Sequence, residues 1–113
     1  MNIDDFVKII RGLADKHPDR TADCQNFEED TEGGLIPVCI VGHAFVIADL
    51  EDKANYIEQS IGEGMFSELV EHGLGIEVSD VRSVDWVQRV QDRQDAGDPW
   101  GAAVVAADRL VKL

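Results

Sequence analysis

The sequence predicts a mainly α-helical (α+β) fold in which four to five short helices surround a central C-terminal helix, with one β-hairpin near residues 24–39. Three observations carry this prediction. Apolar residues recur every three or four positions in several segments, a polar stretch with two glycines separates two short apolar runs, and the last helical segment is apolar on all sides. A chain of 113 residues suffices for one hydrophobic core, so residues 1–113 are expected to form a single globular domain.

The first expected helix begins at the N-terminus. Asn2 can cap it, and Asp4 and Asp5 lie at its positive end, where carboxylates are favourable. Pro18 ends it, because the residue before a proline avoids the helical conformation. Its apolar residues have the spacing of a core-facing stripe. They are Ile3, Phe6, Val7, Ile10, Leu13 and Ala14.

The hairpin is expected in the stretch CQNFEEDTEGGLIPVC, whose apolar ends enclose a polar, glycine-bearing middle. A turn centred on residues 30–33 would pair Cys24 with Cys39 and Phe27 with Ile36, close enough for side-chain contact. Acidic residues crowd the tip, which must therefore be solvated. They are Glu28, Glu29, Asp30 and Glu32.

The run IVGHAFVIADL after the hairpin is continuously apolar and predicts a buried helix, in which Gly42 allows close approach by a neighbour. A strand is the alternative, because the run is rich in β-branched residues. The segments EDKANYIEQSIGEG and MFSELVEHGLG predict two shorter helices. The second of these ends at Gly73, since glycine readily adopts the left-handed conformation that follows a helix.

The C-terminal third predicts two more helical segments. Ser79 can cap the first, which Gly97 ends. Asp98 can cap the second, with Pro99 in its first turn. The sequence WGAAVVAADRLVKL is small and apolar around its first half, which places it at the centre of the bundle or partly in a homodimer interface. The expected core residues are Phe6, Ile10, Cys39, Phe45, Trp86, Trp100 and Val104.

The net charge of −13 is unevenly distributed along the chain. Residues 21–80 contain fourteen acidic residues and one base, Lys53, whereas the flanking segments carry equal numbers of each. Direct nucleic-acid binding and attachment to anionic lipid both require basic clusters, so both are disfavoured. What remains is attraction to a basic protein surface, or solubility alone. The expected interaction residues are Glu28, Glu29, Asp30, Glu32, Asp49, Glu51 and Asp52.

The sequence also predicts a cellular compartment. No apolar run approaches the roughly 20 residues of a membrane span. The start MNIDDF is acidic and lacks the basic and apolar regions of a signal peptide. Two cysteines fit a reducing compartment, so we expect a soluble cytoplasmic protein that does not bind membranes.

Cys24, Cys39 and His43 are the candidates for chemistry. They could hold zinc with a further histidine, or His43 could activate the Cys39 thiol at a helix N-terminus. The spacing Cys-x₁₄-Cys-x₃-His lacks the C-x₂-C pair typical of zinc sites, and the residues around His43 are apolar. We therefore expect interior packing, with no metal, cofactor or catalytic residue. The alternative is a small zinc-binding or thiol-dependent protein that uses these three residues.

Two stretches, CQNF…IPVCIVGHAF (24–45) and VQRVQDRQDAGDPWGAAV (87–104), resemble a family of small acidic proteins of unknown function encoded by bacteriophages of actinobacteria. With the first helix included, the resemblance covers nearly the whole chain. Phe45 departs from the leucine expected there, but the position stays apolar. The resemblance implies a phage product in a bacterial cytoplasm that acts on host proteins, and it carries over no functional residues. We therefore expect a non-catalytic accessory protein that binds a basic host protein through its acidic surface, with mimicry of DNA as a special case.

Overall fold

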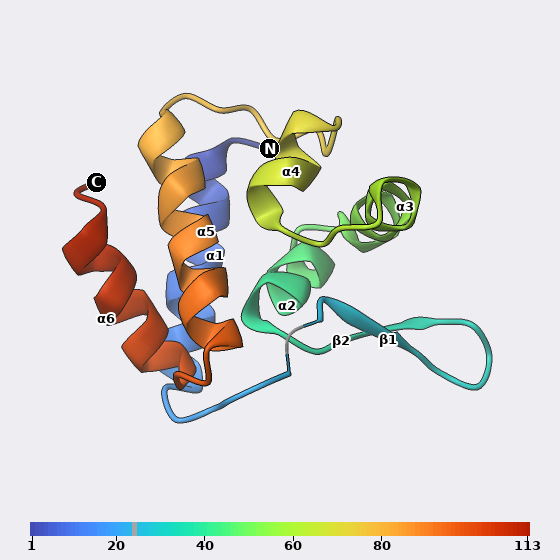
Figure 1. The fold of residues 1–113 in the computed structure, drawn as a ribbon, viewed down its shortest axis with the longest axis horizontal. Helices are drawn as coiled ribbons and strands as arrows, with labels where there is room; N and C mark the ends of the chain where they lie inside the picture. The colour runs from blue at the N-terminus through green and yellow to red at the C-terminus, as the bar shows by residue number, and fades with distance from the viewer. Residues whose placement is uncertain (24) are drawn as a thin grey trace.

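The computed structural model describes residues 1–23 and 25–113, and within them it confirms a mainly helical fold with one antiparallel hairpin (Figure 1). The described residues form six helices rather than four to five. The elements are α1 (Ile3–Lys16), β1 (Phe27–Glu29), β2 (Leu35–Pro37), α2 (Ile40–Ile47), α3 (Glu51–Ile61), α4 (Phe66–Glu71), α5 (Val81–Asp95) and α6 (Trp100–Leu110).

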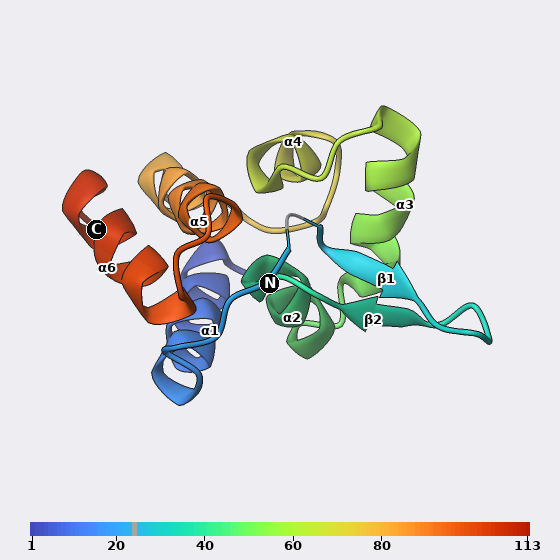
Figure 2. The same cartoon turned by 60° about the horizontal axis from the view of Figure 1, so that its bottom comes forward.

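Two groups of elements lie side by side in the molecule. Helices α1, α5 and α6 pack together, while α2, α3, α4 and the hairpin form the other half (Figures 1 and 2). The core joins the two halves through a cluster of phenylalanine rings, in which Phe6 of α1 contacts Phe45 of α2 and Phe66 of α4. All seven residues expected in the core are buried, so this prediction is confirmed.

Helix α1 forms as the sequence predicts. The Asn2 side chain accepts a hydrogen bond from the Asp4 backbone N–H at 2.9 Å, and His17 follows the last helical residue, just before Pro18. All six apolar residues of the expected stripe are buried. The backbone of Ile3 also donates to Glu77, so the start of α1 is fixed to the segment that leads into α5.

Helix α6 does not occupy the centre of the bundle, contrary to the prediction. It lies at one edge of the molecule and packs on α5 and α1 through one face (Figure 1). Its buried residues are Trp100, Ala103, Val104 and Ala107. Val105 is 50% exposed and Leu110 is 64% exposed, so small apolar residues serve close packing on one side only. A homodimer interface on this helix stays a prediction.

The hairpin is present, but its register differs by one residue from the prediction. Phe27 pairs with Pro37, not with Ile36, because the connecting loop includes Gly34. The Asp30 carboxylate closes that loop by accepting the N–H groups of Glu32 and Gly34 at 2.9 and 2.7 Å. The expected pairing of Cys24 lies outside the described residues.

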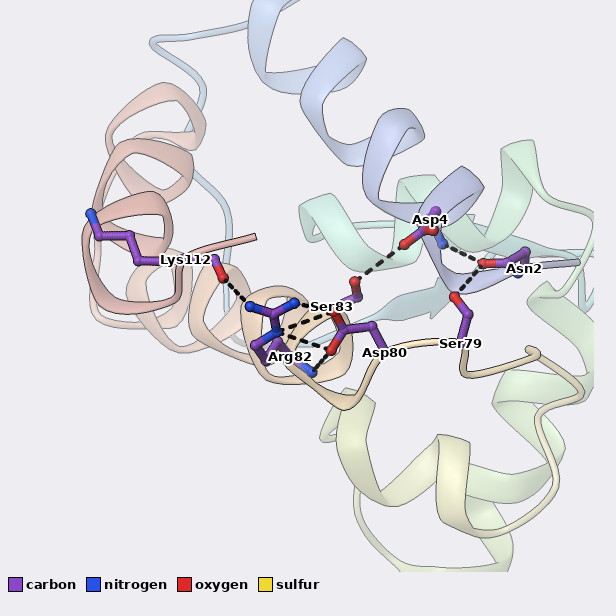
Figure 3. Close-up of polar contacts among 7 residues, drawn as sticks. All are labelled: Asn2, Asp4, Ser79, Asp80, Arg82, Ser83 and Lys112. Carbon is purple, nitrogen blue, oxygen red and sulfur yellow. Dashed lines mark hydrogen bonds and ion pairs between the residues drawn. The ribbon is translucent and has the colours of Figure 1, made fainter.

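Two helix caps also differ from the prediction. Asp80, not Ser79, caps α5 by accepting the Arg82 N–H at 2.9 Å, while the Ser79 hydroxyl donates to Asn2 (Figure 3). Helix α6 starts after Pro99 without a side-chain cap. Asp98, the expected cap, accepts a hydrogen bond from Arg93 at 2.8 Å instead. Ser79 and Asp98 thus each bond another side chain and do not cap the helix that follows them.

Candidate protein-binding surface

The uneven charge along the chain becomes a separation of charge in space. Helices α1, α5 and α6 belong to residues 1–20 and 81–113, which contain equal numbers of acidic and basic residues. The hairpin, α2, α3 and α4 belong to residues 21–80, which carry the whole net charge of −13. Eleven of these fourteen acidic residues lie between Glu28 and Glu71, the span of the hairpin, α2, α3 and α4. Because the two groups of elements form different halves of the molecule, most of the net charge lies in one half, which we call the acidic half (Figure 1).

The hairpin carries the first group of expected interaction residues, and all four are exposed. Asp30 stabilises the turn, because its carboxylate and its backbone N–H both form hydrogen bonds across the loop. Gly33 in this turn has a φ of +80°. Glu28 accepts a hydrogen bond from the exposed Gln25 amide at 2.9 Å. The fixed turn therefore presents the exposed carboxylates of Glu28, Glu29 and Glu32 on a short, defined hairpin.

The second group lies where α2 passes into α3. Asp49 is exposed and has a φ of +58°, a left-handed conformation that aspartate tolerates better than most residues. Asp52 is exposed in the first turn of α3, where the helix dipole favours a carboxylate. Glu51 is only partly exposed, and one of its carboxylate oxygens is buried with no hydrogen-bond partner in the described part of the chain. Asp49 and Asp52 are therefore the more accessible members.

Cys39 is an interior residue that caps helix α2. Its thiol is 1% exposed, donates to Asn26 Oδ1 at 3.1 Å and accepts the Gly42 N–H at 3.3 Å. Burial raises the pKa of Cys39 to about 12, well above the usual value. A thiol that is protonated and enclosed cannot act as a nucleophile near neutral pH, which agrees with the packing interpretation.

His43 lies one turn further along α2 and is half-buried. Its ring meets the Trp100 ring edge-on, with 5.3 Å between the ring centroids. Burial lowers the pKa of His43, and the nearby charges of Arg20 and His17 lower it further. Among the residues that the structure describes, no three His, Cys, Asp or Glu side chains form a group that could hold a metal ion. Cys24, the third candidate ligand, lies outside those residues.

The buried state of Cys39 predicts its reactivity. At pH 8 only about one thiol in ten thousand would be ionised at such a pKa, so iodoacetamide should leave Cys39 unmodified in the native protein. In guanidinium chloride the same thiol should be alkylated within minutes. Mass spectrometry of the Cys39 peptide measures both. Rapid modification of Cys39 in the native protein would contradict the packing interpretation.

A buried polar network on α5 is the feature that the sequence analysis missed. Gln88, Gln91 and Gln94 are all buried and spaced by three residues. Their carbonyl oxygens accept backbone N–H groups at the starts of two other helices. Gln88 accepts from Ser67 at 3.0 Å, Gln91 from Phe66 at 2.8 Å and Gln94 from Ile40 at 2.9 Å. The repeated spacing of glutamines at positions 88, 91 and 94, next to the buried valines at 87 and 90, was the available signal.

Asn26 joins this network to the rest of the acidic half. Its oxygen accepts from Cys39 and Gln91, and its amide donates to Gly64 O and to Glu58 at 3.0 and 3.2 Å. The network therefore connects the hairpin, α2, α3, α4 and α5. It fixes how the acidic half sits on the other half, but its polar groups are used internally.

Comparison of the chain with protein-family models, with curated proteins and with solved structures finds no match to any of them. No helix in residues 1–23 and 25–113 combines the length and the apolar character that crossing a membrane requires.

Proposed function

We propose that this chain is a non-catalytic, phage-type accessory protein of the bacterial cytoplasm that binds a basic surface of a host protein. The hairpin carboxylates of Glu28, Glu29 and Glu32, with Asp49 and Asp52, form the binding surface. The observation that carries the proposal is the concentration of most of the net charge in one half of the molecule.

The concentration of charge in one half of the molecule is the reason to prefer binding to solubility alone. A solubilising charge works equally well when it is spread over the surface, whereas a one-sided charge creates a field that orients an approaching basic partner. Such complementarity raises association rates and selects partners more than it adds affinity. Host proteins that bind nucleic acid carry the required clusters of Lys and Arg, and they are the class of partner that this surface fits.

The charge on the hairpin can be tested with two variants of equal net charge. Replacing Glu28, Glu29 and Glu32 by Gln should weaken binding of a host protein about 3- to 100-fold, since each exposed ion pair contributes about 0.2–1 kcal/mol. The matched control replaces Asp5, Asp15 and Asp19 by Asn, which removes the same charge from the other half. The partner is captured from an actinobacterial lysate, purified, and titrated by calorimetry.

Wild-type binding should also weaken steeply between low and physiological salt, because exposed charges are screened over about 8–10 Å. An affinity that is insensitive to salt rejects the proposal. So does an equal loss in both variants, because it would mean that overall charge, and not the hairpin, attracts the partner.

A further inference from the structure

An apolar groove of about 400 Å³ lies between α4 and α5, away from the hairpin. Its lining combines four valines with two carboxylates at the border. The valines are Val70, Val78, Val81 and Val84, and the carboxylates are Glu71 and Asp85. We refer to this feature as the valine groove. Ser67 and Gln88, which are hydrogen-bonded to each other, complete one wall.

Two of the valines of this groove are not accounted for by the core, whereas Val70 and Val84 are partly buried and pack against it. Val81 is the first residue of α5 and is 76% exposed, and Val78 is 40% exposed. Single exposed valines are ordinary on protein surfaces. Here the two exposed valines adjoin two partly buried ones in one concavity, and an apolar lining with a few polar groups is characteristic of a binding site.

We propose that the valine groove binds an amphipathic helix of a partner protein, with an apolar stripe and Lys or Arg on its flanks. All of the lining residues except Val78, which lies in the segment before α5, belong to α4 or α5, where the backbone groups are mostly bonded within the helices. Recognition must therefore use side chains, as in the helix-in-groove mode with apolar anchors one and two turns apart.

The carboxylates at the border determine the charge of the partner helix. Glu71 is exposed, and Asp85 is half exposed and forms an ion pair with Arg89 of its own helix at 3.4 Å. Exposed pairs of this kind contribute a few tenths of a kcal/mol, so a cation from the partner can compete for Asp85. The proposal rests on the proposed function for the sign of the partner's charge, but it uses a different surface.

The test uses designed helical peptides as probes and the valine methyl groups as reporters. A peptide with a leucine stripe flanked by lysines should shift the methyl NMR signals of Val70, Val78, Val81 and Val84. The same stripe flanked by glutamates should bind at least tenfold more weakly. Val81→Ser combined with Val78→Ser should weaken the lysine peptide about tenfold, because it removes apolar area from the contact.

Val105→Ser is the matched control, because Val105 is an exposed helical valine on α6, outside the groove. It should leave the affinity unchanged. The proposal is overturned if Val105→Ser weakens binding as much, if the shifts appear on the hairpin instead of the valines, or if the lysine peptide shifts no valine methyl at millimolar concentration. Self-association that the serine variants abolish would also overturn it, since a second copy would then occupy the groove.

The two proposals can fail separately. In one outcome, a captured host protein binds weakly to the variant with Gln at positions 28, 29 and 32 but fully to the double serine variant. That result overturns the valine-groove proposal and supports the hairpin proposal. The reverse result overturns the hairpin proposal and supports the groove.

Discussion

Replacing Gly42 by alanine should lower the free energy of unfolding by about 3 kcal/mol or more. A Cβ atom at this position would lie far inside van der Waals contact with the backbone carbonyl oxygen of Asn26. Overpacking of a core typically costs about 1–3 kcal/mol when side chains can give way. Here the obstructing atom belongs to the backbone, and it also accepts the Val38 N–H at 2.9 Å.

The displaced segment has no room to adjust. Gln25 accepts the Cys39 N–H at 3.2 Å next to this contact, and the Asn26 side chain is the junction of the buried network. Moving Asn26 away from α2 would therefore break backbone bonds to the hairpin as well as side-chain bonds to Glu58 of α3, Gly64 and Gln91 of α5.

Gly12→Ala provides the control for Gly42→Ala, because both glycines are helical. A Cβ at Gly12 meets nothing within 4 Å, so this substitution should stabilise the protein by roughly 0.5–1 kcal/mol through helix propensity. Urea titration monitored by circular dichroism measures both changes. If Gly42→Ala unfolds at the same urea concentration as the wild type, the inference that the Asn26 backbone lies against Gly42 of α2 is wrong.

The elements that the sequence predicts best are those fixed by local interactions. In α1 the Asn2 cap, the apolar spacing and Pro18 all agree, and each can be recognised from neighbouring residues alone. In α5 the choice between two adjacent capping residues depends on contact with the N-terminus. Ser79 is free to cap in isolation, but its hydroxyl bonds Asn2, which is distant in sequence, and Asp80 takes its place.

The position of α6 could not be predicted from its composition. Alanine and valine around a helix are compatible with burial on every side, and also with close packing on one side and exposure on the other. The outcome depends on which neighbours are present, and α6 has α5 and α1 on one face only.

Of the two candidate surfaces, one could be predicted from the sequence and the other could not. The exposed hairpin carboxylates follow from the sequence, because a cluster such as Glu28, Glu29 and Glu32 cannot be buried. The valine groove could not be predicted, since it exists only because α4 packs beside α5. That packing is fixed by Gln88 and Gln91, whose buried amides look like ordinary surface glutamines in the sequence.

Replacing Gln91 by methionine should lower the free energy of unfolding by about 2–4 kcal/mol. Methionine has about the same length and volume as glutamine, so the loss of stability comes from the missing hydrogen bonds. Gln91 Oε1 accepts the Phe66 N–H at 2.8 Å, and its amide donates to Gly64 O at 3.0 Å and to Asn26 at 3.3 Å. A buried donor left without a partner costs about 1–3 kcal/mol, and two further acceptors each lose a donor.

In the Gln91→Met variant, the residue before α4 does not replace the hydrogen bond to the Phe66 backbone N–H. Met65 precedes α4 and supplies no side-chain hydrogen bond, while Phe66 itself is fully buried, so water cannot replace the lost oxygen without opening the core. Amide exchange at Phe66 and Ser67 should therefore accelerate more than exchange in α1.

Gln59→Met on α3 is the control, because Gln59 is exposed and its replacement should change stability by less than about 0.5 kcal/mol. Thermal unfolding compares the two variants. If the Gln91→Met variant is as stable as Gln59→Met, the inference that the network links α4 to α5 is wrong. The valine groove depends on that link, because Val70 of α4 and Val84 of α5 face one concavity only while Gln91 and Gln88 hold the start of α4 on α5.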